Sequence, residues 1–300
     1  MSGERPGRSR RAAARPAPQR NPAAPSAPTC RASPRLSPAR LAALHEKLLG
    51  WYATNGRDLP WRHTVDPYAI LLSEVMLQQT QVPRVVGRYA AFLERFPTLE
   101  SLAAAPLADV LSAWLGLGYN NRALRLKRCA QAAPGHRLPG DLESLRALPG
   151  VGPYTARAVL IFAHNADFAA VDANVRRVLT HQLDLPRDLS PAALQAVAEA
   201  ALPRGRSRDW HNALMDYGSL VLTARATGLA PRTRQTPFAG SHRQRRARLL
   251  RSVLERGALS VSDAAAALDL TPADCRAVVD SLAADGLVTL RGDQVTVRRR

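Results

Sequence analysis

The sequence has little lysine, little cysteine and no long apolar run. Lysine occurs at only two of the 300 positions, although the formal net charge is +18, so almost all the positive charge is arginine. The three cysteines, Cys30, Cys129 and Cys275, form neither a CxxC pair nor a spaced quartet. This spacing gives no case for a zinc site, an iron–sulfur cluster or a disulfide scaffold, and we predict no metal site.

The absence of long apolar runs also limits where the protein can reside. No run approaches the length of a transmembrane helix, and no hydrophobic stretch follows the Arg- and Pro-rich N-terminus as it would in a secretory signal. We therefore expect a cytoplasmic, nucleoid-associated protein with no membrane partner. The basic balance indicates a polyanionic partner, most simply nucleic acid, although a solubilising surface would also produce it.

The composition divides the chain into four parts. Residues 1–38 are mostly Arg, Ala, Pro and Ser, which predicts a disordered basic tail. Residues 39–225 have helical periodicity almost throughout, which predicts an all-α domain. Residues 226–242 lose this periodicity and are expected to be a linker, and residues 243–300 predict three helices and a two-stranded hairpin, the layout of a small winged-helix-like domain.

The helices of the all-α domain are predicted from caps and periodicity. Asp66 and Pro67 are expected to cap and start a helix that continues to about Thr80. A first helix is expected from Leu41 onward. The others are predicted over residues 83–96, 106–115, 121–132, 142–148, 154–163, 174–182, 191–202 and 210–224, followed in the last part by 243–255, 260–268 and 272–284.

One carboxylate lies inside an apolar run. Glu74 is the acidic residue of the segment ILLSEVML, residues 70–77. Apolar surroundings desolvate a carboxyl group and raise its pKa towards neutrality, which suits a general acid. A solvated position on a helix is the simpler interpretation, but the apolar neighbours disfavour it.

The segment LPGVGPYTA, residues 148–156, is the most specific local pattern. Gly150 and Gly152 lie between two helical segments, and Pro153 starts the second of them. The free amides of that helix start can face an anion, as in a helix-hairpin-helix that grips the DNA backbone without reading bases. An ordinary turn between two helices uses the same residue types, and the basic chain favours the DNA-binding interpretation.

A second carboxylate stands just before a predicted helix. Asp172 belongs to AVDANVRRVL, residues 170–179, and the helix is expected to start near Asn174. An N-cap is the ordinary role for such an aspartate. A carboxylate held near a cationic transition state is the functional alternative, and the two roles are compatible because helix amides stabilise the ionised form.

Three segments, SEVMLQQTQV, LPGVGPYTA and VDANVRRVL, together resemble the helix-hairpin-helix DNA glycosylases in order and spacing. Among these, the chain most resembles the A/G-specific adenine glycosylase (MutY) family. GRDLPWR, GLGY and ALMDYGSL extend the resemblance over about residues 41–224. It implies two helical subdomains that flank a cleft, and double-stranded DNA with a mismatched or damaged base pair as the partner. We expect a monomer.

The resemblance implies a catalytic role for four residues. Glu74 would protonate the departing adenine at N7 and later handle the water, and Asp172 would stabilise the cationic sugar. This resembles the division of labour between two carboxylates in glycoside hydrolysis. Asn174 would help to position the water, and Tyr154 would lie near the sugar.

The resemblance also implies residues that bind the DNA and the base. Gln79 and Tyr119 match wedge residues that fill the stack when a base is flipped out. Three more residues resemble the wall of the adenine pocket, although without the family the tryptophan could be core and the two arginines surface: Arg57, Trp61 and Arg62. Asn212 falls at a polar adenine contact, and Gly150 and Gly152 belong to the hairpin.

Two further implications concern what the sequence does not contain. In bifunctional relatives a lysine stands at the position of Tyr154 and cuts the strand through a Schiff base. Neither Lys47 nor Lys127 lies in the hairpin, so we expect a monofunctional glycosylase without lyase activity. The family usually binds a 4Fe-4S cluster through four cysteines, but the first cysteine-matching position is Leu222, so we expect no cofactor and a clusterless branch.

The base specificity stays open at this level. No Nudix-like C-terminal domain is recognisable, and Asn120 replaces the second aromatic residue of the family's GLGYY, so the preference between guanine and 8-oxoguanine as the opposing base is undecided. A mismatch thymine or uracil glycosylase on the same scaffold is an alternative, which QQTQ and LPWR disfavour. A non-catalytic DNA-binding protein is another, which the presence of both carboxylates disfavours.

Overall fold

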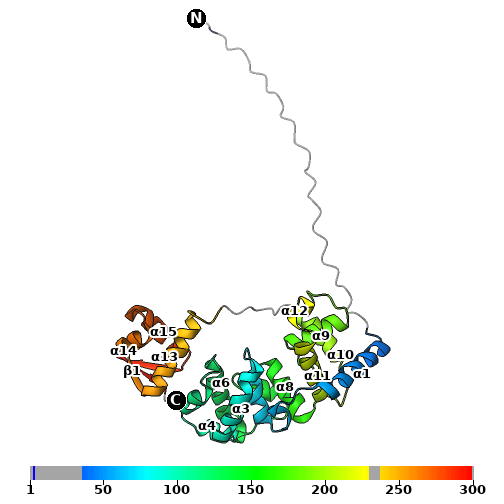
Figure 1. Cartoon of the computed structure of the whole chain (residues 1–300), viewed down its shortest axis with the longest axis horizontal. Helices are drawn as coiled ribbons and strands as arrows, with labels where there is room; N and C mark the ends of the chain where they lie inside the picture. Colours follow the sequence, from blue (N-terminus) through cyan, green and yellow to red (C-terminus); the bar gives the residue numbers. More distant parts are fainter. Residues whose placement is uncertain (1–2, 4–35, 230–236, 299–300) are drawn as a thin grey trace. The chain divides into compact units, whose positions relative to one another are not determined.

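The computed structural model describes residues 3, 36–229 and 237–298 of the chain. The predicted basic tail therefore lies almost entirely outside the described residues, as do residues 230–236 of the predicted linker. The described residues are mostly helical, with short strands only near the C-terminal end (Figure 1). Among them, no helix combines the length and the apolar character needed to cross a bilayer.

The first part of the chain forms a series of helices that matches the prediction closely. Its elements are α1 (Pro38–Asn55), η1 (Pro60–Arg62), α2 (Pro67–Leu77), α3 (Val82–Arg95), α4 (Leu99–Ala104), α5 (Leu107–Trp114), α6 (Asn121–Ala132), η2 (Pro134–His136), α7 (Leu142–Ala147), α8 (Pro153–His164), α9 (Ala173–Gln182), α10 (Pro191–Ala200), α11 (Ser207–Leu220) and α12 (Ala224–Thr227).

The start of α2 follows from its capping residues. The carboxylate of Asp66 accepts hydrogen bonds from the amides of Tyr68 (3.1 Å) and Ala69 (3.2 Å), and Pro67 occupies the first turn. The predicted end near Thr80 is too late, because α2 stops at Leu77 and the next residues form a turn.

Two helical features differ from the prediction. The short helix α4 was not predicted; it is held by a reciprocal capping box between Thr98 and Ser101, in which serine takes the place usually filled by Glu or Gln. The helix predicted over residues 210–224 starts and ends too late, because α11 runs from Ser207 to Leu220 and a separate helix, α12, begins at Ala224.

The buried side chains of this part form two apolar clusters. The first comes mainly from α2 to α8 and includes Phe92 and Trp114. The second comes from α1, α9, α10 and α11 and includes Leu48 and Trp210. The first helix of the chain thus packs beside α11, which is far away in the sequence (Figure 1). This arrangement confirms the predicted all-α fold with two helical subdomains.

The C-terminal part contains three helices and a small sheet. Its elements are α13 (His242–Arg256), β1 (Ala258–Ser260), α14 (Val261–Leu268), α15 (Pro272–Ala284), β2 (Val288–Arg291) and β3 (Gln294–Val297). The strand order is β1-β3-β2, with both pairings antiparallel. The predicted two-stranded hairpin was therefore incomplete, because β1 adds a third strand on the other edge of β3.

Helices α9 and α11 come unusually close at one glycine. A Cβ atom on Gly218 of α11 would lie 2.8 Å from the Cβ and 3.0 Å from the carbonyl oxygen of Asn174 in α9. Such a distance leaves no room for a side chain. Gly218 therefore fixes how closely the two helices pack in the second cluster.

We predict that Gly218→Ala lowers the free energy of unfolding by about 1–3 kcal/mol, because α9 and α11 must separate to admit the methyl group. Urea denaturation followed by circular dichroism measures this change. Gly87→Ala is the matched control, because Gly87 is exposed on α3 and a Cβ there meets no described atom within 4 Å. The control should be neutral or stabilising by about 0.5–1 kcal/mol, and equal stability of the two variants would contradict the packing argument.

Candidate active site

Glu74 is buried on α2, and its environment favours the protonated acid. Its side chain lies among the apolar residues of α2, which packs against α8, and only 8% of the residue is exposed. Burial desolvates the carboxylate and raises the pKa of Glu74 to about 7, helped by the negative charge of Asp172 and opposed by a hydrogen bond from Tyr154. Glu74 can therefore carry a proton near neutral pH.

Tyr154, in the first turn of α8, feels the charge of both carboxyl groups. Burial raises the pKa of Tyr154 well above its ordinary value, and the charges of Glu74 and Asp172 raise it further. The phenol therefore stays protonated and donates its hydrogen bond to Glu74. Since both carboxylates raise the pKa of one phenol, Glu74, Tyr154 and Asp172 lie close to one another.

Asp172 is the N-cap of α9, so the ordinary role considered for it is real. Its Oδ1 accepts from the amide of Val175 at 2.7 Å, and its Oδ2 accepts from Nδ2 of Asn174 at 2.8 Å. Burial nevertheless raises the pKa of Asp172, against the opposing effect of these bonds and of the Arg177 charge. The carboxylate is thus both a cap and a desolvated group beside Glu74.

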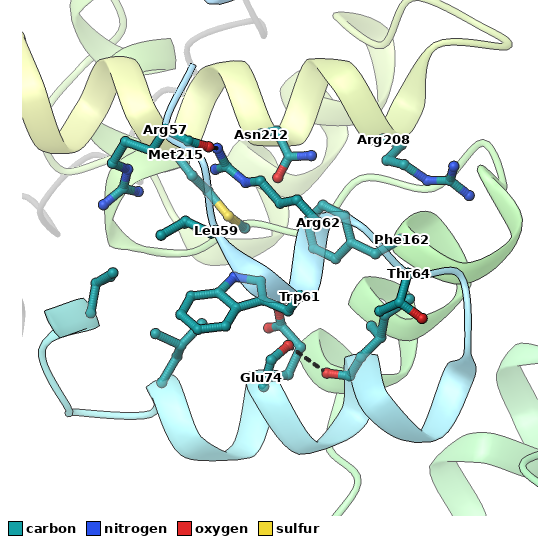
Figure 2. Close-up of a pocket in the computed structure, with 14 residues that line it drawn as sticks. Arg57, Leu59, Trp61, Arg62, Thr64, Glu74, Phe162, Arg208, Asn212 and Met215 are labelled. Carbon is teal, nitrogen blue, oxygen red and sulfur yellow. Dashed lines mark hydrogen bonds between the residues drawn. The ribbon is translucent and has the colours of Figure 1, made fainter. Parts of the chain in front are cut away.

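A cavity of about 540 Å³, open to solvent, lies above Glu74. Figure 2 shows the Trp61 ring next to Glu74, with Arg62 and Asn212 around the same space. Tyr154 and Asp172 do not line this cavity and reach it only through Glu74. Its lining combines aromatic, cationic and amide side chains, a combination that suits a planar polar group such as a base.

Trp61 belongs to both the apolar core and the wall of this cavity. Only 9% of the residue is exposed, and its ring packs edge-on against Tyr89 with centroids 5.5 Å apart. It also lines the cavity, as do Arg57 and Arg62. The two arginines are only partly exposed, with 26% of the Arg57 and 10% of the Arg62 side chain accessible, and both pair with one buried carboxylate.

That carboxylate is Asp216 of α11, whose side chain is fully buried. Arg62 donates to both of its oxygens at 2.8 Å, and Arg57 donates from its backbone amide at 2.8 Å and from Nε at 2.7 Å. Burial alone would raise the pKa of Asp216, but these bonds outweigh it and keep the pKa below its ordinary value. The ion pairs fix the loop before α2 to α11.

Helix α11 presents a second row of side chains to the cavity. Arg208, Asn212 and Met215 lie at helical spacing along one face and all line the cavity. Asn212 is buried and hydrogen-bonds the phenol of Tyr52. Asp216, Arg208 and the cavity residue Phe162 were not predicted as site residues, because their partners are too distant in sequence for spacing to reveal them.

The two hairpin glycines differ in backbone conformation and in the space around them. Gly150 has φ +82°, and a Cβ on it would lie 2.8 Å from the Cβ of Arg125, so both backbone and space demand glycine. Gly152 has φ −84° and is the N-cap of α8, where a Cβ would meet no described atom within 4 Å. Gly152 leaves the start of α8 open to an approaching anion.

Gln79 and Tyr119 occupy two exposed turns. Gln79 follows α2 and has φ 54°, and Tyr119 follows α5 and has φ 46°. Both side chains reach the surface, and 36% of Tyr119 is exposed. The two turns are joined by hydrogen bonds from Arg122.

The donor set does not fit a 4Fe-4S cluster. Leu222 occupies the first cysteine-matching position, is 9% exposed and packs in the second apolar cluster. The whole sequence has three cysteines, whereas the cluster needs four thiolates. Within the described ranges, no group of three or more His, Cys, Asp or Glu side chains could hold a metal ion.

Comparisons with known proteins agree with this geometry. The model of the HhH-GPD superfamily of base excision DNA repair proteins matches residues 72–203. The adenine DNA glycosylase of Mycolicibacterium smegmatis is 40% identical over 276 residues, which cover 82% of this chain and 93% of that protein. The human adenine DNA glycosylase is 35% identical over 75% of this chain and 43% of its own length.

The chain belongs to the HhH-GPD superfamily, in its adenine DNA glycosylase family. It is therefore a DNA N-glycosylase of base excision repair that binds DNA. Among solved structures, a thermostable thymine-DNA glycosylase is similar to it with a TM-score of 0.58 and 31% identity, covering 63% of this chain and 90% of that one.

We predict that base release by this glycosylase has a bell-shaped pH profile. Above pH 7 the single-turnover rate should fall by about tenfold per pH unit, because Glu74, with a pKa of about 7, loses its proton. At the acid end the rate should fall as Asp172 becomes protonated, and burial places that limb above the ordinary aspartate pKa.

The variant Tyr154→Phe tests the origin of the alkaline limb. The phenol lowers the pKa of Glu74 by stabilising its carboxylate, so removing it should move the alkaline limb to higher pH. Single-turnover rates measured across pH for both proteins give this shift. A limb that stays in place, or a wild-type rate that is flat through pH 7, would show that Glu74 is not the titrating acid.

Proposed function

We propose that this glycosylase removes adenine mispaired with guanine or 8-oxoguanine by hydrolysing its N-glycosidic bond. The observation that carries the proposal is the buried Glu74 carboxyl, with a pKa of about 7, facing a solvent-open cavity that Trp61, Arg62 and Asn212 also line. The names of the relatives support adenine as the base.

The reaction needs one acid, one anion and one water. The Glu74 carboxyl gives its proton to N7 of adenine, and the bond between C1′ and the base breaks with its electron pair leaving on the base. The carboxylate of Asp172 stabilises the positive sugar that remains. Water then adds to C1′ and returns a proton to Glu74, so the balance is hydrolysis. Asn174, bonded to Asp172, positions that water, and Tyr154 holds the Glu74 carboxyl.

The adenine binds in the cavity between Trp61 and α11. The flat ring of Trp61 offers a stacking surface, and Asn212 and Arg62 offer polar contacts to the purine edge. Arg57 and Arg62 share the partner Asp216, which holds both guanidiniums in place when the base binds. The pocket is therefore fixed before the base enters.

The hairpin and two turns hold the DNA. The open start of α8 after Gly150 and Gly152 grips a phosphate, which positions the duplex without reading sequence. Gln79 and Tyr119 enter the stack in place of the extruded base. The partner is double-stranded DNA with a mismatched or damaged pair, and the protein acts as a cytoplasmic monomer without a cofactor, since the thiolates of a cluster are not available.

A thymine or uracil mismatch glycosylase is the second candidate, favoured by the similarity to the thymine-DNA glycosylase structure. Labelled duplexes containing A:8-oxoG, A:G, T:G or U:G pairs, treated with the protein and then alkali, separate the two functions. Adenine release from the first two duplexes supports the proposal. Release of only thymine or uracil replaces it.

We expect Glu74→Gln to lower the single-turnover rate of base release by a factor of about 10² to 10⁴, because the amide cannot donate the proton that the leaving base needs. Binding of the same mismatched duplex, measured by fluorescence anisotropy, should persist. Glu46→Gln on α1 is the matched control and should leave both unchanged. Full turnover by Glu74→Gln would remove this residue from the mechanism.

We also predict that no strand cleavage accompanies base release before alkali is added. Lys127 is buried and donates to the carbonyls of Ala103 at 2.8 Å and Ala105 at 2.5 Å, and Lys47 on α1 donates to Gln182 at 2.8 Å. Neither amine can form the Schiff base that lyase chemistry requires. Borohydride should trap no covalent protein–DNA adduct, whereas Tyr154→Lys, which places an amine beside the sugar, should give one. A wild-type adduct would refute monofunctional action.

A further inference from the structure

Arg122, in the first turn of α6, is a buried cation with an unusual set of partners. Only 7% of the residue is exposed, and it makes no ion pair with any described carboxylate. Its two terminal nitrogens instead lie 2.6–3.1 Å from six oxygen atoms. A buried guanidinium is costly unless its donors are used, so this arrangement calls for a reason.

One nitrogen of Arg122 caps the end of α2. Its Nη1 donates to the carbonyls of Val75 (2.7 Å), Met76 (2.9 Å) and Gln78 (2.6 Å). Val75 and Met76 belong to the last turn of α2, whose carbonyls have no partner within the helix, and Gln78 is the C-cap. A positive charge at a helix C-terminus is also favourable. Arg122 therefore fixes the start of the turn that carries Gln79.

The other nitrogen reaches the second exposed turn. Its Nη2 donates to the carbonyls of Leu117 and Gly118, both at 3.1 Å, and to the hydroxyl of Thr80 at 3.0 Å. The guanidinium also lies over the ring of Tyr119, 5.6 Å from its centroid. One planar group thus bonds backbone on both sides, directly before Tyr119 and directly around Gln79.

Both turns need to be held. Gln79 (φ 54°) and Tyr119 (φ 46°) have left-handed backbone conformations, which non-glycine residues adopt only when the surroundings impose them. In each turn the residue immediately before the left-handed one offers its carbonyl to Arg122. The hydroxyl of Thr80 adds a direct contact between the turns, 3.4 Å from the carbonyl of Leu117.

We propose that Arg122 is a positioning residue that joins the two turns into one rigid unit, so that Gln79 and Tyr119 enter the base stack together when the target base is extruded. The proposal rests on the stack-filling role of these two residues. Arg122 does not touch the DNA or the base. It acts through the geometry of the turns.

A lysine cannot replace this arginine, because an ammonium is a point donor and lacks the planar fork that faces two turns at once. Arg122→Lys should therefore keep the charge and lose the bridge. With 2-aminopurine beside the target base, the stopped-flow fluorescence change that reports extrusion should slow by about tenfold, and base release from the duplex should slow with it. The pH at which base release falls should stay that of the wild type, since Glu74 is unchanged.

A double-mutant cycle separates positioning from a general structural effect. In the background Gln79→Ala/Tyr119→Ala, where both wedges are absent, Arg122→Lys should no longer alter the extrusion rate. If the substitution slows extrusion as much in that background as in the wild type, the proposal fails. Arg128→Lys, on the exposed face of the same helix, is the matched control and should leave extrusion unchanged in both backgrounds.

If circular dichroism shows that Arg122→Lys does not fold, Thr80→Val replaces it in the double-mutant cycle. It removes one acceptor of Arg122 and the hydroxyl contact to Leu117, so it should slow extrusion by a smaller factor that likewise vanishes without the two wedges. Additive effects of Thr80→Val would overturn the proposal. The cycle can be run with whichever base the wild type releases, so a wrong base specificity and a wrong role for Arg122 give different results.

Discussion

The desolvation of one carboxyl group is the constraint on which the rest of the structure depends. Glu74 sits in a helix whose residues from Tyr68 to Met76 are all buried, so the helix is enclosed on every side, unlike an ordinary surface helix. That enclosure keeps the acid protonated near neutral pH, and it requires partners on all faces. Helix α8 covers one face and brings Tyr154, and the tryptophan of η1 covers another and forms the wall of the cavity. The same packing that buries the acid therefore builds the site around it.

A second constraint concerns the position of the cavity. It lies between side chains from two separate apolar clusters, so these clusters must keep a fixed position relative to each other. The Asp216 carboxylate does this by pairing α11 of the second cluster with two arginines from the loop that precedes α2 of the first. A buried ion pair adds little net stability compared with apolar packing, but removing one member leaves an uncompensated charge and costs about 3–5 kcal/mol. Its value here is geometric, because it fixes the direction of Arg57 and Arg62 and hence the shape of the pocket.

The sequence predicted most helices because their signals are local. Caps such as Asp66 and proline at the first helical position act within one turn, and the apolar run around Glu74 indicates a buried helix. Most of the features it missed depend on partners far along the chain, whereas α4 was missed because its local capping box has an unusual residue. Strand β1 is three residues long and exists only because β3 pairs with it, and α4 uses a serine in its capping box. The ion pairs of Asp216 join residues more than 150 positions apart. The residues proposed to protonate the base and to stabilise the sugar could be inferred from sequence pattern and family resemblance. The residues that position them could not.

The positioning residues share one chemistry. Arg62, Arg122 and Arg177 are each largely enclosed and each bind more than one element, the last through the carbonyls of Gly218 (2.8 Å) and Leu222 (3.0 Å) and through Asn174, which in turn holds Asp172. The Arg177 contacts tie the end of α11 to α9, the helix that Asp172 caps. A planar guanidinium can satisfy several carbonyls in fixed directions. In a chain with almost no lysine, arginine therefore supplies not only surface charge but also rigid internal contacts between elements, and Arg177 holds α9 against α11 in this way.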